Sequence, residues 1–254
     1  MINGLGEGPP LVLLPGWAMH CGVFGAFTEA LARHWTVYRV DLPGHGAQAP
    51  DGRWSPAALA EQLLRQLPSA AWLGWSLGGQ VALQAAIQQP SRVRALMLVG
   101  VNPCFVARPD WSHGMDATVF AEFEDKLAAD PQGTVGAFLA LQTSGSRQAT
   151  MVMRELRRLH SAAPFPDRES LLRGLYWLRQ ADYRAALPGI DTPALWVAGQ
   201  RDALAPAASS RAAAAMMPRG RLLELPGAGH APFLSHAEPL LTELCSFDGQ
   251  AVST

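Results

Sequence analysis

The stretch AWLGWSLGGQVAL, residues 71–83, places Ser76 between Gly74 and Gly78. An apolar run precedes the serine and an alanine-rich segment follows it, which predicts a buried strand, a sharp turn and a helix. On such a turn a serine is presented as a nucleophile above the amino terminus of the helix. In a chain this rich in glycine the pattern also arises by chance roughly one time in eight. Whether Ser76 is a nucleophile or part of an ordinary glycine-rich turn must therefore be judged from other residues of the chain.

A serine nucleophile needs a histidine base and an acid that orients the histidine, because an unassisted hydroxyl is a poor nucleophile. The sequence supplies both further along the chain. Asp202 follows the apolar run ALWVAG (194–199), and His230 lies in a small-residue loop after the run RLLELPG (221–227). The order serine, acid, histidine is the one that accompanies a nucleophile elbow of this kind. We predict that Ser76, Asp202 and His230 form a catalytic triad.

Three other residues are weaker candidates for the acid and the base. Asp191 precedes its predicted strand and so belongs to the opposite edge of the sheet. His236 stands at the start of the last predicted helix, where a solvated or capping histidine is ordinary. His45 follows a predicted strand but comes before the serine in the chain. For the three preferred residues, the alternative roles are a turn serine, a capping aspartate and a loop histidine.

Ester cleavage also needs two N–H donors for the negatively charged oxygen of the tetrahedral intermediate. Leu77, the residue after the nucleophile, supplies one. The loop LLPGWAMH (13–20) is expected to supply the other, because Gly16 lets the backbone approach and Trp17 then donates its N–H. The Trp17 indole would form a wall of the pocket; the alternative is that it is only a core aromatic.

Short apolar runs alternate with longer helical patterns along most of the chain. This alternation predicts an α/β fold with a mostly parallel central sheet and helices on both faces. Strands are expected at 11–15, 35–41, 70–75, 93–100, 194–199 and 221–227, and helices at 23–33, 56–67, 78–88, 206–217 and 237–246.

Residues 105–186 break this alternation, because they show helical patterns and no convincing strand. We therefore predict an inserted helical cap (lid) at 105–186, with a core formed by 1–104 and 187–254. The expected cap helices are 116–129, 131–143, 147–160 and 168–180.

Composition narrows the classes of function. The formal net charge is −1 over 254 residues, without the basic stripe of a nucleic-acid-binding protein. No apolar stretch approaches the roughly 18 residues of a membrane span, and the first ten residues lack the features of a signal peptide. Cys21, Cys104 and Cys245 are far apart and odd in number, which argues against a disulfide framework or a zinc site. We expect a cytoplasmic protein with no metal, cofactor, nucleic-acid or membrane partner.

Six motifs give the sequence a resemblance to known proteins: LVLLPGW, VDLPGHG, WLGWSLGGQVA, NPCF, FLALQTSG and GHAPFLSH. They resemble the α/β-hydrolase superfamily and, within it, the family of pimeloyl-[acyl-carrier protein] methyl ester carboxylesterases of biotin synthesis. The resemblance implies the α/β-hydrolase fold and a serine carboxylesterase with Ser76 as nucleophile, Asp202 as orienting acid and His230 as base. One departure is Pro15, where the family usually has a histidine.

The resemblance also implies a substrate and a partner. The substrate is a methyl ester at the end of an apolar acyl chain, whose other end is joined to acyl carrier protein, and the products are pimeloyl-[acyl-carrier protein] and methanol. Implied substrate contacts are Trp17, Leu77, Phe138, Leu139, Ala140, Leu141 and Gln142.

Because acyl carrier protein is acidic, basic side chains on the cap are candidates for docking it. We assign this role to Arg154, Arg157, Arg158 and Arg173. The first three can share one face of a helix. The alternative is that they form an ordinary solvated helix face.

Two other functions stay open, because fold and triad do not fix the substrate. The first is a general esterase or lactonase of the same fold that acts on small free esters. The second is a ligand receptor that binds in the pocket without turnover. We expect a monomer.

Overall fold

A seven-stranded sheet forms the centre of the protein in the computed structural model, which describes residues 3–252, with side chains up to 248. Its strands lie in the order β1-β3-β2-β4-β5-β6-β7, and all neighbours are parallel except β1 and β3. The expected mostly parallel sheet is therefore confirmed. The strands are β1 (Gly4–Leu5), β2 (Pro10–Leu14), β3 (Thr36–Arg39), β4 (Ala70–Trp75), β5 (Val93–Val99), β6 (Ala194–Gly199) and β7 (Gly220–Leu225).

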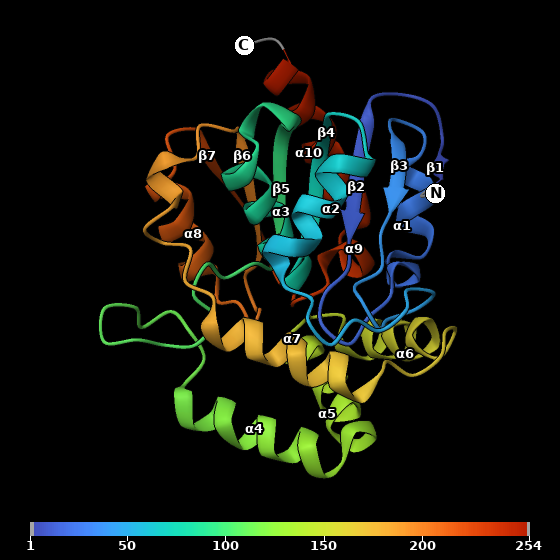
Figure 1. Cartoon of the computed structure of the whole chain (residues 1–254), viewed down its shortest axis with the longest axis vertical. Helices are drawn as coiled ribbons and strands as arrows, with labels where there is room; N and C mark the ends of the chain where they lie inside the picture. Colours follow the sequence, from blue (N-terminus) through green and yellow to red (C-terminus); the bar gives the residue numbers. More distant parts are fainter. Residues whose placement is uncertain (1–2, 253–254) are drawn as a thin grey trace.

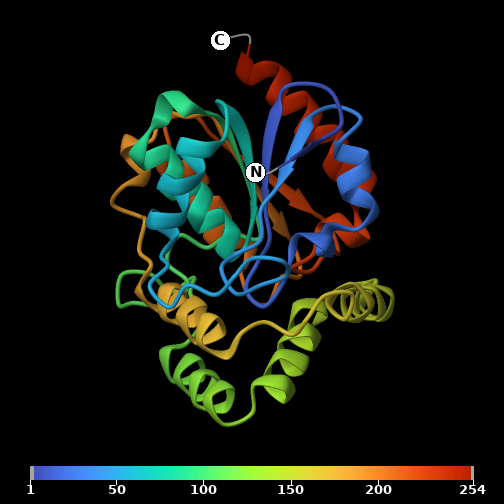
Figure 2. The same ribbon diagram turned by 45° about the vertical axis from the view of Figure 1, so that its right-hand side comes forward.

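Both faces of the sheet are buried, because successive strand residues point to opposite sides. On β2, Val12 and Leu14 belong to one apolar core, and Leu11 and Leu13 belong to the other. Figure 2 shows the two helical layers on either side of the sheet. One layer contains α2 (Pro56–Gln66), α3 (Leu77–Gln88) and α8 (Ala207–Met216), and the other contains α1 (Ala26–Leu31), α9 (Pro232–Ser235) and α10 (Ala237–Val252).

The sequence patterns missed three local features of the core. The pair β1 with β3 spans only two residues of β1, which is too short for a periodic signal. The helix expected at 23–33 is divided into a 3₁₀ turn, η1 (Cys21–Phe24), and α1, because Gly25 adopts φ +50° between them. The short helix α9 was not anticipated, since its four residues are too few to show a helical period.

Four helices cover the carboxyl ends of the strands (Figure 1). Aspartate side chains begin three of them by accepting backbone N–H groups: Asp116, Asp130 and Asp167. The helices are α4 (Ala117–Ala129), α5 (Pro131–Thr143), α6 (Ala149–His160) and α7 (Arg168–Gln180). Of all helices within residues 3–252, none is long and apolar enough to cross a membrane.

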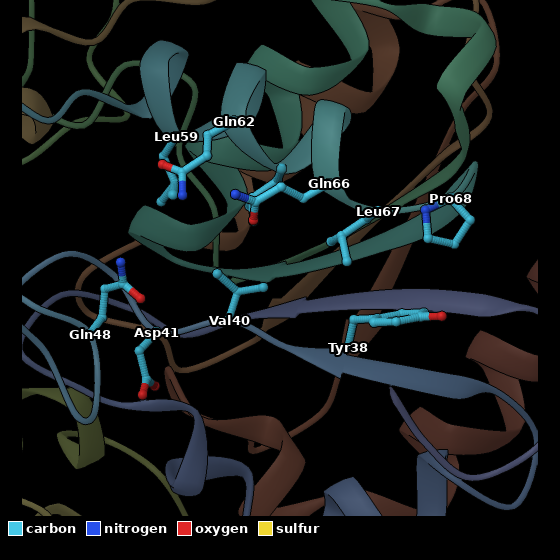
Figure 3. A pocket seen from close by; sticks show the side chains of 10 residues that line it. Tyr38, Val40, Asp41, Gln48, Leu59, Gln62, Gln66, Leu67 and Pro68 are labelled. Carbon is cyan, nitrogen blue, oxygen red and sulfur yellow. The ribbon is translucent and has the colours of Figure 1, made fainter. Parts of the chain in front are cut away.

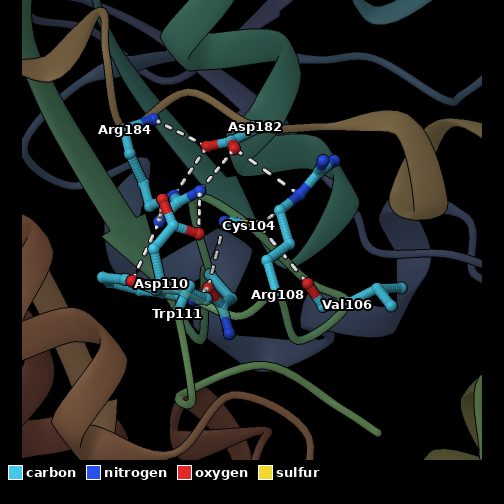
Figure 4. Close-up of polar contacts among 8 residues, drawn as sticks. Cys104, Val106, Arg108, Asp110, Trp111, Asp182 and Arg184 are labelled. Carbon is cyan, nitrogen blue, oxygen red and sulfur yellow. Dashed lines mark hydrogen bonds and ion pairs between the residues drawn. The ribbon is translucent and has the colours of Figure 1, made fainter. Parts of the chain in front are cut away.

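A charged cluster joins the segment that leads into these helices to the segment that leads out (Figure 4). Arg184 donates to Asp182 at 2.7 Å and to Asp110 at 3.1 Å. Arg108 lies 3.5 Å from the same Asp182 carboxylate. Hydrogen bonding from Arg184 is the largest cause of the lowered pKa of Asp182, and burial opposes it. The cluster therefore holds an ionised Asp182 between two arginines at the base of the helical layer.

Candidate active site

Ser76 lies on a strained turn between β4 and α3. Its φ and ψ are 53° and −117°, a left-handed conformation that is uncommon for a residue other than glycine. Only glycine fits at the two flanking positions, because other backbone atoms lie too close to leave room for a side chain. A Cβ on Gly74 would lie 2.5 Å from the carbonyl oxygen of Gly78, and one on Gly78 would lie 2.5 Å from that of Pro15. This geometry is the one that the nucleophile-elbow prediction requires.

His230 and Asp202 form a buried pair. The Nδ1 of His230 lies 2.8 Å from Oδ2 of Asp202, and the other carboxylate oxygen accepts the N–H groups of Leu204 and Ala205 at 2.8 and 2.9 Å. Because an ionised carboxylate only accepts, Nδ1 carries the proton and Nε2 keeps its lone pair. That Nε2 is buried and has no hydrogen-bond partner among the described residues. The imidazole is thus oriented as a base.

The three residues follow β4, β6 and β7, whose carboxyl ends meet at one edge of the sheet. Sites in parallel sheets collect at this edge, and the strand order reverses between β2 and β4. Ser76 is only 8% exposed and His230 1%. The site is therefore covered by the cap helices.

Trp75 supports the histidine, a role that the sequence reasoning missed. Its indole N–H donates to the carbonyl oxygen of His230 at 2.8 Å, and the two rings are 5.5 Å apart. The alternation of side chains along β4 could have indicated this role. It places Trp75 on the same face as Leu73, in the core that also contains Phe233. The sequence separation of 155 positions concealed the contact itself.

The loop after β2 approaches the serine as expected. A Cβ on Gly16 would lie 3.2 Å from Cβ of Ser76, so the loop passes close to the serine side chain. Leu77 opens α3, where no preceding turn supplies an acceptor for its N–H. Ala18 has φ +61°, a second left-handed residue beside the site. The loop and the first turn of α3 together provide the setting for an oxyanion hole.

The Trp17 indole bridges the core and the cap helices. Its N–H donates to the carbonyl oxygen of Leu171 on α7 at 2.9 Å. Its ring packs edge-on against Phe123 of α4 at 5.6 Å and Phe138 of α5 at 4.8 Å. The side chain is thus packed between the core and these helices, and its role as a pocket wall stays a prediction.

The five residues from 138 to 142 do not share one environment. Phe138, Leu139 and Gln142 are buried, whereas Ala140 and Leu141 are exposed. Because consecutive helical residues point in different directions around the helix axis, these five side chains do not all face one side, and their role as substrate contacts stays a prediction. The carbonyl oxygen of Gln142 accepts the N–H of His230 at 3.1 Å. Its side-chain amide is buried without a partner among the described residues.

The four arginines predicted to dock the carrier protein lie in different environments. The side chains of Arg154 and Arg157 are exposed, form no hydrogen bond or salt bridge within residues 3–248, and border a 510 Å³ cavity beside α6. The pKa of Glu155 is lowered chiefly by its hydrogen bond from Arg158 and also by the charge of Arg154. Arg158 is held by Glu155 at 2.6 Å. Arg173 donates to the carbonyl oxygen of Trp54 and stacks on two aromatic rings. The guanidinium of Arg173 therefore has partners within the protein, and its role in docking stays a prediction.

The weaker candidates lie away from the pair. Asp191 is exposed and precedes β6, at the opposite edge of the sheet. His236 bonds to Ser235 and Pro226 between α9 and α10. His45 donates to the carbonyl oxygen of Pro43, and burial lowers its pKa to about 4. None of the three is hydrogen-bonded to the triad residues in the described part of the chain.

Another cavity, of about 710 Å³, lies between β3 and α2 (Figure 3). Tyr38, Asp41, Gln62 and Gln66 are among its lining residues, and no member of the triad lines it. The lining residues include no serine, cysteine or histidine. Within the described residues, no cluster of three or more histidine, cysteine or acidic side chains is arranged to hold a metal ion.

Comparisons with known proteins agree with this geometry. The chain matches the alpha/beta hydrolase family over residues 11–243. It is 45% identical over 251 residues to the pimeloyl-[acyl-carrier protein] methyl ester esterase of Xylella fastidiosa (strain M12), covering 97% of each chain. A protein of the same name from Xanthomonas oryzae pv. oryzae (strain MAFF 311018) is 45% identical over 249 residues, also covering 97% of each chain. Among solved structures, an esterase from Exiguobacterium antarcticum has a TM-score of 0.86 at 22% identity and covers 97% of this chain and 94% of its own.

Proposed function

This chain belongs to the alpha/beta hydrolase family, and we propose that it is a serine esterase that hydrolyses the methyl ester of pimeloyl-[acyl-carrier protein]. The observation that carries the chemistry is the elbow at Ser76 together with the buried Asp202–His230 pair. The choice of substrate follows from relatives that are 45% identical over almost the whole chain and carry that activity in their names.

In the first half of the reaction, Nε2 of His230 takes the proton of Ser76 Oγ as the oxygen attacks the ester carbonyl carbon. The carbonyl oxygen becomes an oxyanion between the N–H groups of Leu77 and Trp17. The protonated histidine then gives its proton to the leaving methoxide. Methanol departs, and the acyl group stays on Ser76 as an ester.

In the second half, His230 takes a proton from water, which attacks the acyl-enzyme at the same carbon. The intermediate collapses, and the histidine returns its proton to Ser76 Oγ. The free carboxylate of the pimeloyl group leaves with its carrier. Asp202 keeps Nδ1 protonated and stabilises the imidazolium in both halves.

The covering helices suit a long apolar acyl chain better than a small polar ester. Phe138 and Leu139 offer buried apolar surface on α5, and Trp17 faces Phe138 above the serine. The unpartnered amide of Gln142, next to His230, is placed to hydrogen-bond a polar group of the substrate. We include Phe138 and Gln142 among the substrate contacts.

The carrier end of the substrate would dock on α6. Arg154 and Arg157 present two positive charges on its exposed side, and neither forms a salt bridge within residues 3–248. An acidic carrier helix would find complementary charge there. The thioester arm would then reach the serine beneath the cap helices.

The test compares two substrates on the purified protein. We expect a higher kcat/KM for pimeloyl-[acyl-carrier protein] methyl ester, followed by methanol release, than for p-nitrophenyl acetate. Ser76→Ala should lose on the order of 10⁴-fold or more in kcat on both. A fluorophosphonate should label the wild type at Ser76 only.

Three other outcomes would contradict the proposed function, each in a different way. Equal or better turnover of the small ester would favour a general esterase over the carrier-linked substrate. Stoichiometric retention of the carrier substrate without turnover would favour a ligand receptor. Full activity in folded Ser76→Ala would reject the mechanism itself.

A further inference from the structure

The loop that brings Trp17 to Ser76 is held by all four cap helices. The Trp17 indole contacts α4, α5 and α7, as described above. The fourth contact comes from His20, whose Nε2 lies 2.8 Å from the carbonyl oxygen of Leu159 on α6. The loop therefore connects the nucleophile with every part of the helical layer.

Both ring nitrogens of His20 are engaged. Nδ1 accepts the N–H of Gly22 at 3.1 Å and begins the 3₁₀ turn η1. Nε2 must then carry the proton that it donates to Leu159. In this tautomer the imidazole satisfies both partners, because one ring nitrogen accepts a hydrogen bond and the other donates one.

The loop needs such support because its conformation is unusual. Ala18, one residue from Trp17, adopts φ +61°, which an alanine does not favour. On the core side, the loop is fixed at Cys21, whose N–H donates to Asp41 at 2.6 Å. Between Gly16 and Cys21 there is no regular strand or helix to hold the backbone. Side-chain bonds to the cap helices take that role.

We propose that His20 is a positioning residue for the oxyanion hole. By bonding α6 to the loop, it keeps the backbone N–H of Trp17 directed at the developing oxyanion. The position of α6, where the carrier would dock, is thereby coupled to the catalytic geometry. This inference rests on the proposed serine-esterase chemistry, but it does not depend on which ester is the natural substrate.

The test uses two substitutions that separate the two bonds. His20→Asn keeps an acceptor for Gly22, as in an Asx-turn, but is too short to reach Leu159. His20→Phe keeps a ring and loses both bonds. His34→Asn, at an exposed histidine, is the matched control. Fluorophosphonate titration gives the concentration of competent sites, so that a folding defect is not read as slow chemistry.

With a small p-nitrophenyl ester, we expect kcat per titrated site to fall about tenfold in His20→Phe, with KM within about twofold. This is less than the roughly 10²–10³ lost on removing an oxyanion donor, because the donor is only misaligned. Binding of a trifluoromethyl ketone, whose adduct places an oxyanion in the hole, should weaken by a similar factor. His20→Asn should fall between, and His34→Asn should match the wild type.

Unchanged kcat and inhibitor binding in both His20 variants would overturn the proposal. A loss confined to the number of titrated sites would reduce His20 to a purely structural residue and would also overturn it. If the wild type hydrolyses the small ester but not the carrier substrate, the proposed substrate fails while the His20 result still stands. If the wild type hydrolyses no ester at all, the proposed function itself fails.

Discussion

At the scale of single residues, backbone strain is concentrated where the chemistry takes place. Within the described residues, Ser76 and Ala18 are the two non-glycine positions with positive φ. Each such conformation costs about 1–2 kcal/mol. Both lie beside the proposed oxyanion hole, one on the elbow and one on the loop after β2. The protein therefore maintains these conformations at the expense of stability, as expected where a reactive geometry is held in advance of the reaction.

The buried pair gives a prediction that separates the two candidate acids. Asp202→Asn should bind substrate but lose about 10⁴ in kcat, because an amide favours the wrong imidazole tautomer, as it does in serine proteases with the same triad. Asp191→Asn should stay within about twofold, since its exposed carboxylate stands at the opposite sheet edge. Steady-state kinetics of the two variants on one ester would measure this. The reverse ranking would show that Asp202 is not the acid.

His45 predicts how stability depends on pH. Its folded pKa is about 4, lowered chiefly by burial, against 6.5 when unfolded. Between these values the unfolded chain binds more protons, so stability falls as pH decreases from about 7 to 4. The share of His45 is at most about 3 kcal/mol. In His45→Gln, urea unfolding at pH 7 and at pH 4 should differ less than in the wild type. Parallel losses in the two proteins would contradict the prediction.

At the scale of elements, the sequence predicted what is local and periodic. The runs around β2 to β7 were readable because buried parallel strands are short and continuously apolar. The helix at 23–33 was predicted too long, because one glycine conformation divides it. The assignment of 138–142 as substrate contacts came from the resemblance, which supplied a segment without helical phase, and it stays a prediction. Contacts such as Trp75 with His230 connect distant positions, and no local pattern encodes them.

The charged cluster at the base of the cap helices gives an element-scale prediction. Asp182→Ala leaves Arg184 and Arg108 without their shared carboxylate. Because the carboxylate is partly exposed, the expected loss is about 1–2 kcal/mol, measured by urea unfolding. Limited proteolysis near residues 103–111 should also become faster. Asp125→Ala removes an exposed acid on α4 and should change stability by less than about 0.5 kcal/mol. Equal effects of the two substitutions would assign no special role to the cluster.

At the scale of the whole molecule, the helical layer closes the edge of the sheet where the triad lies (Figure 1). Ser76 is 8% exposed beneath it. The same layer contacts the Trp17 loop and carries Arg154 and Arg157 on α6. In the proposed function, substrate admission, oxyanion geometry and carrier docking would all involve this one layer.

This arrangement makes carrier docking separable from chemistry. Arg154→Glu with Arg157→Glu reverses two charges on α6 that form no salt bridge within residues 3–248, whereas Arg158 is already paired with Glu155. We expect a higher KM for the carrier substrate, on the order of tenfold at low salt, mainly through slower association. The defect should shrink at high salt, because the Debye length falls to about 3 Å at 1 M. Turnover of a small ester should change little, since the triad is untouched. Arg33→Glu, exposed at the far edge of the sheet, is the control. Equal losses on both substrates would mean that the arginines stabilise the cap helices, and no loss on either would make them an ordinary solvated face.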